Sequence, residues 1–299
     1  MGRTGDSLSA AAMSIDVEDW FHVENLRRAV PRHTWKSQEL RVDRAMDRML
    51  RLMADWDVKA TCFILGWVAD QRPHLVRRIA EAGHEIASHG YGHDLIYELK
   101  QAEFHADVER SKQLLEDISG QQVRGYRAPS FSLTDWAMPI LRAVGFEYDS
   151  SLFPTTVPHS RYGKLAALKI KEDPIVSYEG LTEVSMSCLT VGAHAIPWAG
   201  GGYFRLMPYP VFRLGVKRIL WSGKPYIFYI HPWELDVGQP RLNGLKRSER
   251  MRHYLNLEKA ESRWISLLRD FDWVTIAHLL SLSNDERPAS DTLSIAQPL

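Results

Sequence analysis

Two histidines separated by three residues, His89 and His93, offer imidazole ligands for a single divalent cation. They lie in the segment SHGYGH, whose glycines disfavour a helix and favour a loop or a single turn. Asp16, Glu18 and Asp19 directly follow an apolar stretch near the N-terminus. A carboxylate from this group would complete an Asp-His-His site with open positions for water. Such a ligand set suits Zn²⁺, and also Co²⁺ or Ni²⁺.

Hydrolysis at a metal centre also needs a base to accept a proton from water and an acid to protonate the leaving group. The carboxylates exceed what the metal requires, so one of them can be the base. His231, at the end of the apolar segment YIFYI, can be the acid. Arg127 can orient the base through a bidentate carboxylate pair that keeps it ionised. The structural alternatives are a solvated acidic loop, a histidine that only ends a strand, and an ordinary salt bridge.

These residues follow apolar segments that alternate with helical patterns. Strands are predicted at 11–17, 60–65, 84–89, 123–129, 146–151 and 225–235. Apolar residues at helical spacing predict helices near 42–53, 75–83, 104–120, 134–145 and 249–270. Successive strand–helix units favour a parallel sheet with helices outside, either a barrel or a doubly wound sheet. Functional groups in such folds gather at the carboxyl ends of the strands, so we expect the acids, histidines and Arg127 to meet on one rim.

The composition excludes several classes of protein. Among 299 residues, 37 Lys and Arg balance 37 Asp and Glu, so the formal net charge is +0 and a nucleic-acid partner is not expected. Two cysteines are too few for a disulfide framework or a thiolate zinc finger. No targeting segment or membrane span is visible, which predicts a cytoplasmic protein. Peripheral association with a protein complex at the inner face of the membrane is compatible with this prediction.

The ordered segments SIDVEDW, SHGYGH, GYRAPS, EYDSS and YIHPW resemble the five motifs of the polysaccharide deacetylases of carbohydrate esterase family 4, over about residues 11–280. Longer segments, among them DVEDWFHVE, GHEIASHGYGH, GGGYFR and IHPWELDVGQPR, resemble the subfamily encoded at exosortase (PEP-CTERM) exopolysaccharide loci. The resemblance implies an α/β fold, a single-domain distorted (β/α)7 TIM-like barrel. It also implies a hydrolase that removes N-acetyl groups from amino sugars of a polysaccharide.

Position within the motifs implies a role for each residue. The resemblance makes His89 and His93 metal ligands, His231 the catalytic acid, and Arg127 the residue that positions the base. Asp149 corresponds to an aspartate after the fifth strand whose role is more structural.

The first motif departs from the family pattern of two adjacent aspartates, because this chain has Asp16, Glu18 and Asp19. Alignment on the strand makes Asp16 the base and puts the metal ligand at Glu18 or Asp19. Alignment of VED on the family's FDD makes Glu18 the base and Asp19 the ligand. Strand alternation puts Asp16 and Glu18 on one face and does not decide between them. We predict Asp16 as the base and Asp19 as the ligand, with Glu18 as the alternative base or ligand.

The predicted domain is a barrel over 11–280 with a loop-rich insert at about 150–215, between tails at 1–10 and 281–299. The glycines at 200–202 are interpreted as a structural turn. Trp20, Trp198 and Trp233 are candidates for stacking on pyranose rings, and the basic residues between 241 and 252 are interpreted as a solvated helix face.

The sequence therefore favours a metal-dependent carbohydrate N-deacetylase in exopolysaccharide biosynthesis. Its partner would be an N-acetylated polysaccharide or a lipid-linked oligosaccharide. One alternative is a ring-opening or other small-molecule amidase on the same barrel. A second is a non-catalytic glycan-binding component of a synthesis complex. The oligomeric state is not indicated.

Overall fold

A computed structural model describes residues 10–156, 162–163, 174–178 and 180–285. The predicted N-terminal tail lies outside these residues except for residue 10, and the predicted C-terminal tail lies outside them beyond residue 285. Residues 281–285 belong to the last helix, so that helix continues past the predicted start of the tail. No helix in the described part of the chain is both long enough and apolar enough to cross a membrane.

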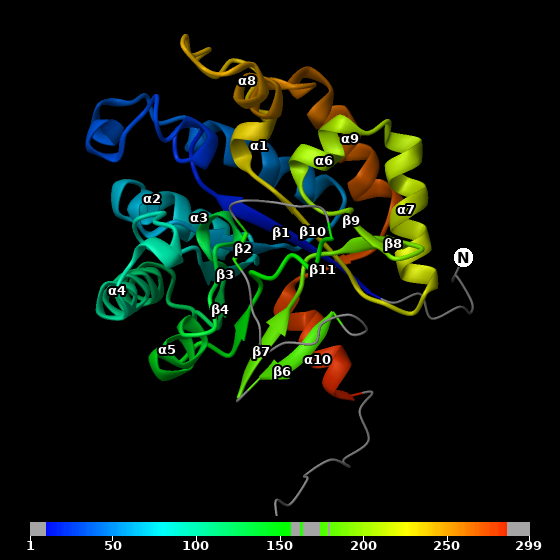
Figure 1. The fold of residues 1–299 in the computed structure, drawn as a ribbon, viewed down its shortest axis with the longest axis horizontal. Coiled ribbons are helices and arrows are strands. Elements are labelled where there is room, and N and C mark those ends of the chain that lie inside the picture. The colour runs from blue at the N-terminus through cyan, green and yellow to red at the C-terminus, as the bar shows by residue number, and fades with distance from the viewer. Residues whose placement is uncertain (1–9, 157–161, 164–173, 179, 286–299) are drawn as a thin grey trace, which may run out of the picture.

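A curved sheet forms the centre of the molecule (Figure 1). Its strands are β1 (Ala11–Val17), β2 (Thr61–Ile64), β3 (Glu85–Ser88), β4 (Gly125–Tyr126), β5 (Tyr148–Asp149), β6 (Ile175–Tyr178), β7 (Leu181–Val184), β10 (Tyr226–Ile230) and β11 (Trp273–Val274). The order is β10-β1-β2-β3-β4-β5-β7-β6, with β11 beside β1. Every pair along this path is parallel except β7 with β6, so seven described strands run parallel from β10 to β7. This arc is the predicted distorted (β/α)7 barrel, left open in the described residues between β10 and β6.

The described helices pack around the sheet. They are α1 (Val42–Asp55), α2 (Gly66–Gln71), α3 (Pro73–Glu81), α4 (Gln101–Ser119), α5 (Ala137–Val144), α6 (Gly201–Leu206), α7 (Tyr209–Trp221), α8 (Arg247–Tyr254), α9 (Leu257–Asp270) and α10 (Ile276–Asp285). Figure 1 shows α2–α5 on one side of β1 and α6, α7 and α9 on the other. A sheet covered on both faces needs apolar residues along its whole strands, and every residue of β1 is buried.

The register of the parallel strands explains why distant residues meet. Ile15 pairs with Ile230 across β1 and β10, and Ser88 pairs with Tyr126 across β3 and β4. The next residues along these strands are Asp16 beside His231, and His89 beside Arg127. Because all these strands point the same way, their carboxyl ends form one rim, as the sequence predicts.

The region at 150–215 contains more regular structure than the predicted loops. It includes β6, β7, a hairpin of β8 (Cys188–Val191) and β9 (His194–Pro197), α6, and the start of α7. Three prolines of this region stand at the ends of these elements, where a missing N–H costs little. Pro174 precedes β6, Pro197 ends β9, and Pro208 precedes α7.

The predicted helix at 249–270 is two helices, α8 and α9. The chain leaves the helical conformation at Leu255, and Asn256 adopts a left-handed backbone with φ of 51°. Asparagine tolerates this conformation better than most residues. The Asn256 side-chain amide donates to the carbonyl of Arg205, which ties the break to α6.

Candidate active site

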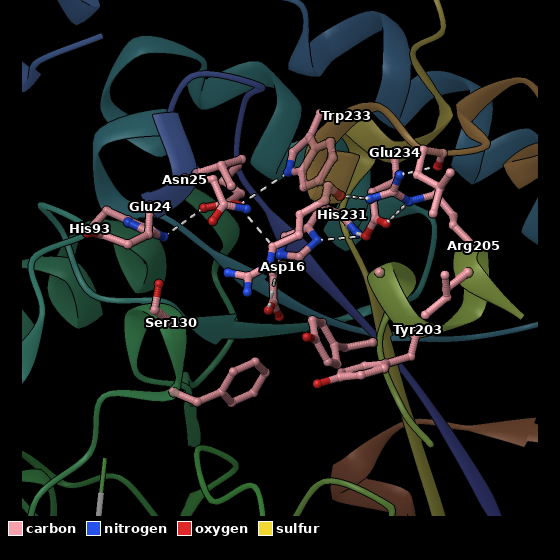
Figure 2. Close-up of a pocket in the computed structure, with 18 of the residues that line it drawn as sticks. Asp16, Glu24, Asn25, His93, Ser130, Tyr203, Arg205, His231, Trp233 and Glu234 are labelled. Carbon is pink, nitrogen blue, oxygen red and sulfur yellow. Dashed lines mark hydrogen bonds and ion pairs between the residues drawn. The ribbon is translucent and has the colours of Figure 1, made fainter. Parts of the chain in front are cut away.

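A cavity of about 430 Å³ opens at the carboxyl ends of the central strands. Its lining includes Asp16, Glu18, His89, His93 and His231, all proposed from the sequence as site residues. Figure 2 shows that Asp16 and His231 point toward each other and that His93 approaches from the other side of the pocket. Five of the seven residues proposed for catalysis or metal binding therefore line one pocket.

Asp16 forms a buried ion pair with Arg127. The Asp16 Oδ1 atom lies 2.6 Å from Arg127 Nη1, and neither side chain is more than 2% exposed. The guanidinium also donates to the carbonyl and hydroxyl of Ser150 and to the hydroxyl of Ser14. The predicted bidentate pair is wrong, because only one nitrogen bonds the carboxylate and the others hold the guanidinium in place. Arg127 is thus rigidly oriented and gives Asp16 a fixed counter-charge.

Glu18 lies with the two histidines. Its Oε2 atom is 2.8 Å from His93 Nε2, and ligand atoms of Glu18, His89 and His93 all lie within 4.8 Å of one another. His89 Nδ1 lies 2.8 Å from the Arg127 carbonyl oxygen, to which it donates. That bond fixes the tautomer and leaves His89 Nε2 as the atom with a free lone pair, the usual arrangement behind a metal-binding histidine. One carboxylate and two imidazoles, all buried, are a donor set that fits Zn²⁺ or a similar divalent ion.

Asp19 was the predicted metal ligand, and the structure places it elsewhere. Its Oδ2 atom accepts hydrogen bonds from the backbone N–H groups of Arg41 and Val42, at 2.6 and 2.9 Å, and its Oδ1 atom accepts one from Trp20 N. The N–H groups of Arg41 and Val42 are donors at the start of α1, which need an acceptor because no helical carbonyl precedes them. The chain turns after β1, where Glu18 N donates to the Asp16 carbonyl, and Glu18 rather than Asp19 faces the histidines.

His231 stands between the two carboxylates and a third acid. Its Nε2 atom is 3.5 Å from Glu18 Oε1 and 3.9 Å from Asp16 Oδ2. Its Nδ1 atom is 2.8 Å from Glu234 Oε1, and Glu234 Oε2 in turn lies 2.6 Å from Arg205 Nε. Glu234 therefore holds the imidazole so that Nε2 faces the pocket, and Arg205 holds Glu234.

The charges of these groups shift their pKa values. Burial by itself lowers the pKa of His231, but the hydrogen bond to Glu234 and the negative charges of Glu18, Glu234 and Asp16 raise it to about 9. Burial alone would raise the pKa of Glu18, yet the imidazoles of His93, His231 and His89 hold it well below its ordinary value. Burial lowers the pKa of His89 to about 4, against the opposing charge of Asp16. The arrangement favours a protonated His231, an ionised Glu18 and a neutral His89.

Glu234 and Arg205 were not proposed from the sequence. Glu234 stands three residues after His231 and follows Pro232, the spacing of a capping box, and its carboxylate accepts from His231 N. That spacing could have identified Glu234. Arg205 lies near the end of α6, and the glycines interpreted as a turn are at the start of this helix. A Cβ atom at Gly201 would lie 1.9 Å from Glu234 Oε1, so the close approach to Glu234 requires glycine there.

The remaining candidates from the sequence contribute to the fold or to the surface of the protein. Trp20 is 2% exposed and Trp198 is 7% exposed, and neither lines the pocket. Trp233 does line the pocket, but the imidazoles of His231 and His253 stack on its indole ring. Asp149 is fully buried and accepts from the N–H and hydroxyl groups of Ser151. The basic residues from 241 to 252 are exposed, as a solvated face would be.

Two family models match adjacent parts of the chain. Residues 34–148 match the polysaccharide deacetylase family, and residues 150–281 match a domain of unknown function (DUF3473). A peptidoglycan deacetylase of Helicobacter pylori is 30% identical over 105 residues, which cover 35% of this chain and 36% of that protein. A chitooligosaccharide deacetylase of Bradyrhizobium is 30% identical over 82 residues, covering 27% and 37%. The chain thus matches only about a third of the length of these curated relatives.

Solved structures share the fold over nearly the whole chain. A candidate polysaccharide deacetylase from Mycobacterium smegmatis aligns with a TM-score of 0.61 at 20% identity, covering 100% of this chain and 98% of that one. The PuuE allantoinase aligns with a TM-score of 0.58 at 13% identity, covering 94% and 92%. At these identities the alignments establish the barrel fold. The likeness to polysaccharide deacetylases in the family model is confined to residues 34–148, and each of these curated relatives matches about a third of the chain or less.

Proposed function

We propose that this protein is a metal-dependent hydrolase that removes N-acetyl groups from amino sugars of a polysaccharide. The observation that carries the proposal is that two carboxylates at the end of one strand have different partners. Asp16 is paired with Arg127, Glu18 is paired with the two histidines, and His231 lies between them. The relatives named as peptidoglycan and chitooligosaccharide deacetylases support an N-acetylated sugar as the substrate.

Glu18, His89 and His93 would hold the cation, with Zn²⁺ as the first choice and Co²⁺ or Ni²⁺ as fitting alternatives. When bound, the ion supplies Lewis acidity that polarises the amide carbonyl and makes water acidic enough to be deprotonated near neutral pH. The assignment replaces the predicted ligand Asp19 by Glu18, because both oxygens of Asp19 already accept backbone hydrogen bonds.

Asp16 acts as the general base. Its Oδ1 atom is bonded to Arg127 and its Oδ2 atom faces the pocket and His231. The attacking water gives its proton to Oδ2 as its oxygen bonds to the acetyl carbon. The fixed guanidinium keeps the carboxylate oriented through this transfer, which limits the reorganisation that the reaction requires.

His231 acts as the general acid. The C–N bond breaks as the leaving nitrogen takes the proton from His231 Nε2, which releases acetate and leaves a free amine on the sugar. The carboxylate of Glu234 stabilises the imidazolium before the transfer and sets its orientation. Aromatic side chains of Phe131, Tyr203 and Tyr229 in the pocket wall offer apolar surface for a pyranose ring.

The proposal also includes a biological role and a cellular location. The subfamily resemblance supports a role in exopolysaccharide biosynthesis, on a polymer or a lipid-linked oligosaccharide at the cytoplasmic face of the membrane. We also propose a single barrel over about residues 11–280, in which the segment at 150–215 contributes β6–β9, α6 and the start of α7.

Acetate release from N-acetylglucosamine oligomers tests the activity. The metal-loaded protein should release acetate, and chelation or the substitution His89→Ala should abolish release. His105→Ala changes a half-exposed histidine on α4 and is the matched control that should keep full activity. Activity that survives both chelation and His89→Ala would overturn the metal mechanism.

A further inference from the structure

Helix α7 carries apolar side chains on two sides. Phe212, Val216, Ile219 and Leu220 are buried against the barrel. On the other side, Val211 is 50% exposed, Leu214 62% and Trp221 66%. A helix that is apolar on both sides is ordinarily covered on both, so the outward side of α7 is expected to meet a partner.

The outward apolar residues form one stripe with a cation inside it. Val211, Leu214, Arg218 and Trp221 follow one another at steps of three, four and three, which places them on one side of the helix. Arg218 is exposed, and Lys217 borders the stripe. We call these five residues the α7 outer face.

The charge around the α7 outer face is positive. No Asp or Glu occurs between residues 185 and 233, while five Lys or Arg residues do. Two of the five have buried or partly buried carboxylate partners, Arg205 with Glu234 and Arg213 with Asp270. For Lys217, Arg218 and Lys224 no carboxylate lies within ion-pair distance among the residues that the structure describes. Cations beside exposed Leu and Trp are the composition of a helix that lies in an anionic lipid interface.

A hairpin formed by β8 and β9 lies next to α7 (Figure 1), and its strand β8 is in contact with α7. The tip of the hairpin is exposed, with Val191 at 52%, and contains no acidic residue. A second copy of the chain is a poorer occupant, because pairing two such faces would bring their unpaired cations together.

We propose that the α7 outer face docks the protein on the surface of an anionic lipid bilayer. Trp221, Leu214 and Val211 enter the headgroup region, while Lys217, Arg218 and Lys224 contact lipid phosphates. Helix α6, which contributes Tyr203 and Arg205 to the pocket wall, is separated from α7 by two residues. Docking therefore holds the pocket close to the membrane. The inference that the pocket meets a lipid-linked saccharide there rests on the proposed function, but the docking itself does not.

Flotation with vesicles tests the contact without any substrate, so its outcome is separate from that of the deacetylase assay. The full-length protein should float with vesicles that contain phosphatidylglycerol, bind phosphatidylcholine vesicles at least tenfold more weakly, and dissociate as salt is added. Two double variants separate the contribution of apolar contact from that of charge. Leu214→Ser with Trp221→Ser removes apolar contact, and Lys217→Gln with Arg218→Gln removes charge. Each should weaken binding roughly tenfold or more.

Trp56→Ser is the matched control, because Trp56 is an exposed tryptophan at the end of α1. It should bind vesicles as the unchanged protein does, and circular dichroism should show that all variants are folded. Absence of vesicle binding would overturn the proposal, as would equal binding to both lipids or equal binding by the double variants. Analytical ultracentrifugation tests the alternative occupant. If the protein does not bind vesicles but forms a dimer, and the Leu214→Ser and Trp221→Ser changes dissociate that dimer, the α7 outer face binds a second copy instead.

Discussion

Asp16 Oδ1 and Arg127 Nη1 lie 2.6 Å apart in the core of the site, although the two residues are 111 positions apart in the chain. Arg127 is fully buried: Nη1 also donates to the Ser14 hydroxyl, and Nε and Nη2 donate to Ser150. The guanidinium carbon lies over the ring of Phe63, 4.0 Å from the ring centroid. The guanidinium is therefore a fixed part of the barrel, and the orientation of Asp16 depends on it.

Replacing Arg127 should slow catalysis through Asp16. We expect Arg127→Met to lower kcat about a hundredfold or more, since the base loses its counter-charge and its orientation. Arg127→Lys keeps the charge but cannot make all the contacts to the serines, so its kcat should lie between those of the unchanged enzyme and Arg127→Met. Steady-state kinetics of acetate release would measure both. Arg124→Met removes an exposed arginine next to β4 and should leave kcat unchanged. An Arg127→Met enzyme with full kcat would exclude this role.

Glu18 and Asp19 should respond differently to loss of charge. Glu18→Gln should abolish stoichiometric Zn²⁺ binding, measured by calorimetry, because a neutral amide is a poor zinc ligand. Asp19→Asn should retain the metal and instead lower the free energy of unfolding by about 1 kcal/mol, because it weakens the hydrogen bonds to the start of α1. The reverse pattern, with metal lost in Asp19→Asn and kept in Glu18→Gln, would restore the original sequence prediction.

The pH dependence of activity should show the effect of Glu234 on His231. An acid must be protonated to act, so activity is lost as the pH rises through the pKa of His231, which is raised to about 9. Glu234→Gln removes a charge that raises this pKa, so the alkaline limb of kcat/KM should move to lower pH. Glu234→Asp keeps the charge and should move the limb less. If the limb stays in place in Glu234→Gln, another group controls it.

His84 should make stability depend on pH. Its Nδ1 atom accepts a hydrogen bond from Ala60 N–H, and burial together with the charge of Lys59 lowers its pKa to about 4. Between about pH 6.5 and 4 the unfolded chain binds this proton and the folded chain does not, so stability falls as the pH is lowered. From pH 7 to pH 5 the loss from His84 should be about 2 kcal/mol at most.

Urea unfolding at the two pH values measures this contribution. His84→Asn keeps a neutral acceptor and should reduce the loss of stability between pH 7 and 5, while His105→Asn on α4 should not. An identical loss in the His84→Asn variant and the unchanged protein would show that His84 is not kept neutral by the fold.

The alternation of strands and helices in the first half of the chain, and the rim on which the candidate site lies, could be predicted from the sequence. Strand β1, for example, is read directly from AAMSIDV, and the start of the acidic cluster follows from where its apolar run ends. Local patterns suffice here because apolar periodicity and glycine positions act within a few residues. That Asp16, His89, Arg127 and His231 share a rim also follows, because the carboxyl ends of parallel strands must lie together.

The roles of Glu18 and Asp19 needed the tertiary structure. They are adjacent in sequence, and both are buried carboxylates. Only the position of α1, whose first N–H groups lie beside Asp19, and of His93, which lies beside Glu18, distinguishes them. The same holds for Arg205, whose partner Glu234 is 29 residues away. Composition and periodicity determined which side chains are available to this site, and the packing of distant segments decided which of them can touch, because contact depends on distances that no local pattern contains.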